Sequence, residues 1–232
     1  MRGYQPSPDS ITPQTTIVMS AHQYQHLTES QIVHFLAHGY VRIPSAIPAS
    51  ACAAWTSALW PRLGYDPADQ TTWLQERINM PSHRRVPAAT FSPSAWGAIC
   101  ELLGGEDRID PECSDWSDGF IVNLGKKEYE NIQEVDPKTL DNWHVDGDFF
   151  VHFLDSPEQG LLVIPIFSDI EKGDGGTMIA PEGIGMVARW LRDHPEGVSP
   201  RMGPLGEERG LEWYIEKVCI VLAKAMCAGG MY

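Results

Sequence analysis

The chain has 232 residues, of which 43% are hydrophobic, and a formal net charge of -14 at pH 7. This length fits one large domain or two small ones, and the apolar content supports a sizeable core, which excludes a disordered protein. The acidic balance without a basic run argues against nucleic acid and anionic membrane surfaces as partners, and no apolar run approaches the roughly 18 residues of a membrane helix.

Residues 1–26 carry only a short apolar patch, so we interpret them as a flexible lead-in and not as a secretory signal. The first helix is predicted to begin after Thr28, which has capping-box spacing to Gln31, and to end at Gly39. Its apolar face would consist of Ile32, Phe35 and Leu36.

The segment YVRIPSAI, residues 40–47, is typical of a short strand. A second helix is expected over residues 50–64, where Pro61 and Gly64 would break it. A third is expected within residues 91–105. There Ser92 serves as the cap, Pro93 lies just inside the helix, and Gly104 follows its end.

From Gly119 onward the pattern changes to strands. Alternating or apolar runs predict strands over residues 119–125, 143–153, 160–170 and 177–181. Helical spacing returns in residues 182–197, with apolar positions at Val187, Trp190 and Leu191 and an end at His194 before Pro195. Helices followed by a strand-rich core indicate an α+β protein with a β-sandwich or barrel.

The stretch DNWHVDGDFF, residues 141–150, contains the residues with the clearest chemistry. In a strand, His144 and Asp146 would project from the same face. An imidazole nitrogen beside a carboxylate oxygen suits a divalent first-row metal, above all non-haem iron(II) held by two histidines and one carboxylate. The alternative is a histidine–aspartate hydrogen bond on a half-buried strand, and the pattern alone leaves both open.

Three segments, taken in order, resemble the phytanoyl-CoA dioxygenase-like family of Fe(II)- and 2-oxoglutarate-dependent oxygenases. LTESQIVHFLAHGYVRIPSAI looks like the opening helix and strand of that family, WHVDGDFF like its metal motif, and DGGTMIAPEG is similar to its turn-and-strand segment. The resemblance implies a double-stranded β-helix, or jelly roll, with helices packed on one side.

By this resemblance, His144 and Asp146 would be iron ligands, and Asn123 and Thr177 would line the pocket for the 2-oxoglutarate cosubstrate. For the latter two, hydrogen bonds to the backbone or to core water are the alternative. The expected activity is hydroxylation or another oxidation of a small organic substrate by dioxygen. Halogenation is disfavoured, because related halogenases carry a small residue in place of the aspartate. Trp143, Phe149 and Ile164 are expected to pack in the core.

The family also uses a second histidine on a late strand, followed by an arginine or lysine that holds 2-oxoglutarate. After Asp146 the sequence has only His152 and His194. Six residues of strand would place His152 about 20 Å away unless the strand turns back, and His194 is expected at a solvated helix end. We therefore expect an incomplete jelly-roll domain over residues 27–217 and an atypical tail over 218–232, with weak binding of iron and 2-oxoglutarate.

The missing ligand leaves several interpretations open. Three alternatives explain its absence: a shortened oxygenase, a non-catalytic pseudoenzyme or binding protein on the same fold, and a protein whose partner chain completes the site. A metal-dependent hydrolase or isomerase on a cupin-like barrel ranks last, because such barrels usually supply more clustered histidines. The five cysteines are odd in number and widely spaced without a CxxC, which indicates reduced thiols in an intracellular, cytoplasmic protein.

Overall fold

The computed structural model describes residues 24–124, 143–147, 149–170, 174, 176–200, 203 and 205. Its helices are α1 (Glu29–His38), α2 (Ala49–Thr56), α3 (Leu59–Leu63), α4 (Ala88–Phe91), α5 (Pro93–Leu103) and α6 (Pro181–Asp193). Its strands are β1 (Arg77–Asn79), β2 (Arg85–Pro87), β3 (Asp115–Ser117) and β4 (Ile121–Asn123). Short 3-10 turns occur at Gln70–Thr72, Glu106–Arg108, Pro111–Cys113 and Pro157–Gln159. Most of the expected lead-in, up to residue 23, and the expected tail over 218–232 lie outside the described residues.

The capping box predicted at the start of α1 is confirmed. The Thr28 hydroxyl accepts from the backbone N–H of Gln31 at 3.2 Å, and the Gln31 side chain accepts from the backbone N–H of Thr28 at 2.9 Å. The helix ends at Gly39, whose φ of 73° favours glycine. Of the expected apolar face, Ile32 is buried, whereas Leu36 is exposed. The buried face of α1 is therefore narrower than the apolar face that its sequence predicts.

Helix α5 also has the predicted ends. Its first residue is Pro93, and the Ser92 hydroxyl accepts from the backbone N–H of Ala95 at 3.2 Å. Gly104 closes the helix with a φ of 86°. Ala98, on the buried face of α5, packs with Leu27 and Ile32 in one cluster. This cluster joins α5 to α1.

Glu101 of α5 makes a second link to the start of α1. Its carboxylate accepts hydrogen bonds from the backbone N–H groups of Gln25, His26 and Leu27. Burial alone would raise the pKa of Glu101, but these backbone donors outweigh it and lower the pKa. The charged carboxylate therefore holds residues 25–27 against α5.

The single helix expected over residues 50–64 is instead two helices, α2 and α3. Helix α3 begins at Leu59, so Pro61 lies in its first turn. A proline is tolerated there because the N–H groups of a first helical turn have no partner within the helix. Gly64 ends α3 as expected, with a φ of 71°.

The strands form two small antiparallel sheets, one of β1 and β4 and one of β2 and β3. In the first, Ile78 lies opposite Val122. Strand β4 confirms part of the strand predicted over 119–125, including its alternation: Phe120 is buried and Ile121 is exposed. The described part of the chain is thus a mixed helical and antiparallel β structure, in agreement with the α+β class.

The buried carboxylate of Asp118 lies in the sequence between β3 of one sheet and β4 of the other. Asp118 is only 2% exposed and pairs with Arg62 at 3.0 Å and Arg84 at 3.3 Å. Its other oxygen accepts from the backbone N–H groups of His83 and Arg84 at 2.7 and 2.8 Å. Burial would raise the pKa of Asp118, but these donors and cations lower it to about 2. Asp118 therefore connects α3 to the residue pair before β2.

Most of the predicted strands are not formed among the described residues. Residues 40–47, the described parts of 143–153, 160–170 and residues 177–180 contain no strand, and Pro181 already belongs to α6. A single antiparallel bridge joins His152 to Val198. Apolar runs form strands only when a neighbouring strand pairs with them, and the described residues supply none here. No jelly-roll barrel is therefore seen within these residues.

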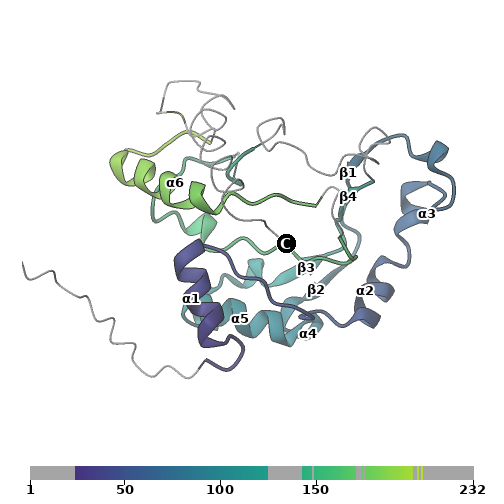
Figure 1. Cartoon of the computed structure of the whole chain (residues 1–232), viewed down its shortest axis with the longest axis horizontal. Helices are drawn as coiled ribbons and strands as arrows, with labels where there is room; N and C mark the ends of the chain where they lie inside the picture. Colours follow the sequence, from purple (N-terminus) through teal and green to yellow (C-terminus); the bar gives the residue numbers. More distant parts are fainter. Residues whose placement is uncertain are drawn as a thin grey trace, which may run out of the picture.

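Residues 160–170 cross the molecule as a long non-helical segment (Figure 1). Phe167 anchors this segment by an edge-on contact with Phe120, at 5.2 Å between ring centres, and also lies near Phe91. Ile164 and Ile166 remain exposed. The expectation that Ile164 packs in the core is wrong. Aromatic contacts at Phe167 hold the segment, and most of its aliphatic side chains, Ile164 included, are exposed.

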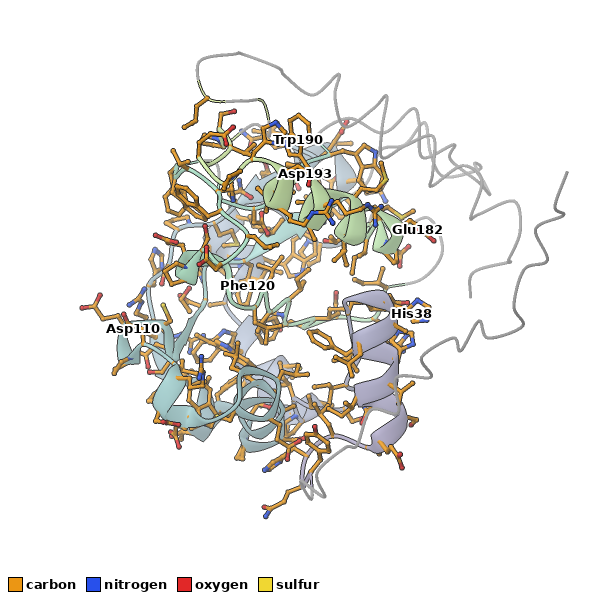
Figure 2. All side chains as sticks on the ribbon, turned by 90° about the vertical axis from the view of Figure 1, so that its left-hand side faces the viewer. His38, Asp110, Phe120, Glu182, Trp190 and Asp193 are labelled. Atoms are coloured by element: carbon orange, nitrogen blue, oxygen red, sulfur yellow. The ribbon has the colours of Figure 1, made fainter. Side chains whose placement is uncertain are left out.

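Helix α6 forms as predicted and ends at His194, whose Nδ1 lies 2.8 Å from the carbonyl of Trp190. Figure 2 shows α6 above the end of α1 that carries His38, and a side chain at Gly39 would collide with Ile184 of α6. The apolar positions of α6, Val187, Trp190 and Leu191, pack around the buried Val198. None of the described helices is long and apolar enough to cross a membrane.

Candidate functional site

The segment with His144 and Asp146 keeps alternating side chains although it is not a strand. Trp143 and Val145 pack against Val198 in the cluster beneath α6. The side chain of His144, between these two residues, is 52% exposed, and that of Asp146, after Val145, is 47% exposed. The two candidate ligands therefore lie together on the outward side of a segment whose other side is anchored in apolar contacts.

The two side chains are in direct contact. Nε2 of His144 lies 3.2 Å from Oδ1 of Asp146, where the imidazole N–H donates to the carboxylate. With metal–ligand bonds near 2.1 Å, two neighbouring donors lie about 3.0 Å apart in octahedral and about 3.4 Å apart in tetrahedral coordination. The observed separation lies between these values. The distance is therefore compatible with both atoms binding one ion once the two side chains turn toward it.

The chain turns sharply just after the pair. Gly147 has a φ of 98°, which favours glycine, and a Cβ atom added there would overlap the ring of Phe150. Nε2 of His152 lies 2.9 Å from the carbonyl oxygen of Gly147. The predicted strand over 143–153, with His152 about 20 Å away, is therefore wrong. His152 folds back to the residue that follows Asp146, but its ring is buried and its Nε2 binds a carbonyl.

A cavity of about 180 Å³ lies beside Asp146. It is lined by Asp146, Gly147, Phe149, Phe150, Glu158, Leu161 and Leu162. The volume is below the roughly 300–1,000 Å³ of typical ligand pockets, so it suits a small group or part of a larger molecule. Phe149 was expected in the core but is exposed, and its ring contacts Phe150 at 5.2 Å between centres.

The residues predicted to hold 2-oxoglutarate lie apart from this cavity's lining. Asn123 is the last residue of β4, opposite Arg77, and is exposed. Thr177 is exposed in the segment before α6. Their assignment to a cosubstrate pocket stays a prediction.

Other candidate ligands do not join the pair within the part of the chain that the structure describes. There, no three histidine, cysteine, aspartate or glutamate side chains gather as a metal site. His194 lies at the end of α6, where its ring contacts that of Trp190 at a tilt of 42°. Cys52, Cys100 and Cys113 are free thiols, and burial followed by the nearby Glu106 raises the pKa of Cys100.

Sequence reasoning left open whether the chain turns back before His152, and it therefore did not place this residue next to Gly147. The signal was present in Gly147, because a glycine inside an apparent strand often marks a turn or a close backbone approach. A turn at that position brings the following residues back toward Asp146. Reading the glycine in this way would have placed His152 near the pair.

Comparison of the chain with protein-family models, curated proteins and solved structures gives no match. The function must therefore be argued from the chemistry of the site, since a fold alone does not specify an activity.

Proposed function

We propose that the chain is an Fe(II)- and 2-oxoglutarate-dependent dioxygenase that oxidises a small organic substrate. The observation that carries this proposal is the spacing of 3.2 Å between Nε2 of His144 and Oδ1 of Asp146, on side chains that are both about half exposed. A neutral imidazole and a carboxylate are the ligand types that such iron centres use.

The surroundings of the pair support a reactive site. Trp143 and Val145 anchor the segment from behind, which limits the movement of the two ligands. Phe149, Phe150 and the neighbouring leucines form an apolar wall next to Asp146, where they can hold the apolar part of a substrate and exclude water. Bound iron and 2-oxoglutarate supply the chemistry, which is the use of dioxygen to attack an unactivated C–H bond.

The proposal requires a third ligand and a cation for 2-oxoglutarate. His152 and His194, which are the only histidines after Asp146 in the sequence, each bind a backbone carbonyl. In the proposed centre, a residue beyond the described ranges, a solvent molecule or a partner chain completes the iron site. The jelly roll is part of the same proposal, in which residues 160–170 and 176–180 pair with further strands.

A non-catalytic binding protein is the second candidate. It is favoured by the engagement of His152 and His194 with backbone carbonyls, because each ring already uses a nitrogen for that contact. Two protein ligands hold a divalent ion less firmly than three and do not fix the open positions. In this case the cavity beside Asp146 binds a small molecule without turnover.

Anaerobic titration with Fe(II), with and without 2-oxoglutarate, tests the first proposal. We expect a visible charge-transfer absorption that needs both additions and that disappears in His144→Ala and Asp146→Ala. His83→Ala and Asp155→Ala are the matched controls, because both residues are exposed and lie outside the site. Admission of air should then convert 2-oxoglutarate into succinate.

The outcomes separate the two candidates. Iron binding with succinate formation supports the dioxygenase. Iron-independent binding of small molecules without succinate formation supports the binding protein. If the ligand variants and the controls bind Fe(II) alike, the pair is not a metal site and the proposal is wrong.

A further inference from the structure

His152 is the largest side chain that is completely buried among the described residues. A buried imidazole is costly unless its polar atoms are hydrogen-bonded. The ring meets this requirement through Nε2, which lies 2.9 Å from the carbonyl oxygen of Gly147. Because a carbonyl only accepts, Nε2 carries the proton and donates.

The ring also fills the inner side of the turn after Asp146. Its centre lies 4.5 Å from that of Phe150, and a Cβ atom on Gly147 would lie 2.9 Å from Cε1 of His152. The imidazole thus occupies the space that a side chain at residue 147 would need. Gly147 and His152 fit each other, and a change in either one alters the turn.

The backbone of His152 is fixed from the other side. Its N–H donates to the carbonyl of Val198, and the N–H of Val198 donates to the carbonyl of His152, both at 2.9 Å. Val198 is itself completely buried and packs against Trp143 and Val145. His152 therefore connects to both ends of the segment that presents His144 and Asp146.

We infer that His152 is a positioning residue for the His144–Asp146 pair. Its hydrogen bond to Gly147 fixes the turn immediately after Asp146. Its backbone pairing with Val198 holds this part of the chain to the cluster that contains Trp143 and Val145. Asp146 is thereby kept within 3.2 Å of His144. The inference rests on the proposed function, since the pair matters chemically only if it binds a metal.

This role differs from that of an ordinary core histidine. An ordinary core residue would influence the site only through the stability of the whole fold. A positioning residue affects the pair in protein that is still folded, and a substitute that restores the N–H at the position of Nε2 should restore the effect. Glutamine places its amide nitrogen near Nε2, whereas asparagine places it near Nδ1 and cannot reach Gly147.

The experiment compares the wild-type chain with His152→Gln, His152→Asn and His152→Leu, and uses His83→Leu as the exposed control. The first measurement is Co(II) binding, followed by the visible spectrum of the bound ion. Supporting residues around metal ligands typically change affinity about 10–100-fold. We expect losses of this size in the asparagine and leucine variants, and near-normal binding in the glutamine variant and the control.

The second measurement needs no metal. In the ¹⁵N–¹H spectrum of the imidazole rings, the His144 signal reports its hydrogen bond to Asp146. We expect this bond to persist in His152→Gln and to weaken in His152→Asn and His152→Leu, while far-ultraviolet circular dichroism shows that each variant is folded. If His152→Leu does not fold, the asparagine and glutamine pair still gives the comparison.

The inference is overturned if folded His152→Asn keeps both the His144–Asp146 hydrogen bond and normal Co(II) binding. That result would leave the dioxygenase proposal intact. If instead the wild-type chain binds no Co(II) but His152→Asn and His152→Leu still lose the hydrogen bond, the positioning role holds and the proposed metal chemistry fails. The two failures are thus distinguishable.

Discussion

The described residues fall into two regions that differ in how they are held together. Residues 24–124 contain the capped helices α1 and α5, both small sheets and nearly all of the buried apolar side chains. The described residues between 143 and 200 contain Val198 as their only completely buried apolar side chain, together with twelve of the seventeen large hydrophobic side chains that are exposed at the described surface. Yet the proposed site lies in this second region.

The difference follows from the range of the interactions involved. Helix caps such as Thr28 and Ser92 act over three residues, so α1 and α5 form wherever the sequence places them. Apolar runs such as residues 160–170 need a strand from elsewhere in the chain before their backbone is satisfied. The first region is therefore specified locally, whereas the second depends on a few contacts around Val198 and His152.

Asp118→Ala should cause the largest loss of stability. The change leaves the guanidinium of Arg62, which is 13% exposed, without its carboxylate and also removes the acceptor for two backbone N–H groups. Removing one partner of a buried ion pair typically costs about 3–5 kcal/mol. Urea unfolding followed by tryptophan fluorescence measures the change.

The control for this prediction is Asp155→Ala, at an exposed position in the second region. We expect a change in unfolding free energy within about 0.5 kcal/mol there. Equal losses in the two variants would mean that the buried ion pairs of Asp118 do not hold the first region together, and the comparison between the regions would have to be abandoned.

A matched isoleucine pair sharpens the same comparison. Ile32 of α1 is 6% exposed and Ile166 is 56% exposed. Truncation of a buried isoleucine to alanine costs about 2–4 kcal/mol, because apolar contacts are lost and a cavity remains. Ile166→Ala should change the free energy of unfolding by less than about 0.5 kcal/mol. Urea unfolding of both variants gives the two values.

A large loss in Ile166→Ala would contradict this expectation. It would indicate that residues 160–170 are covered in solution, as the proposed jelly roll requires. The isoleucine pair therefore also tests the fold that the sequence resemblance implies.

The predictable part of the fold corresponds to its local signals. The ends of α1, α5 and α6 follow from Thr28, Pro93 and His194, and the shared side of His144 and Asp146 follows from their spacing of two residues. The missing strands were not predictable, because the pairing partner of an apolar run is not encoded within the run. The return of His152 to the site depends on the positive φ of Gly147, which a strand pattern conceals.

The stability of the first region should depend on pH through Asp118. Its pKa is lowered from 3.8 to about 2 in the folded protein, so the carboxylate stabilises the fold fully above pH 4. This contribution is lost as the pH falls from about 4 to 2, and the pKa difference corresponds to about 2 kcal/mol. Unfolding free energies of the wild-type chain and Asp118→Asn, measured across this range, should therefore converge at low pH. A constant gap between them would show that Asp118 does not titrate in this way.

Val198→Ala should have a smaller global effect than the Asp118 and Ile32 variants, and the most informative local one. Val198 is completely buried, and removal of two methyl groups costs about 1–2 kcal/mol. Its contacts are with Trp143, Val145 and helix α6, so the loss should fall on the second region. Amide hydrogen exchange should become faster around residues 143–147 and 181–198, while the amides of α1 and α5 exchange as before. Faster exchange in α5 as well would show that the two regions unfold as one unit. The regions would then differ only in whether local or long-range interactions specify their structure.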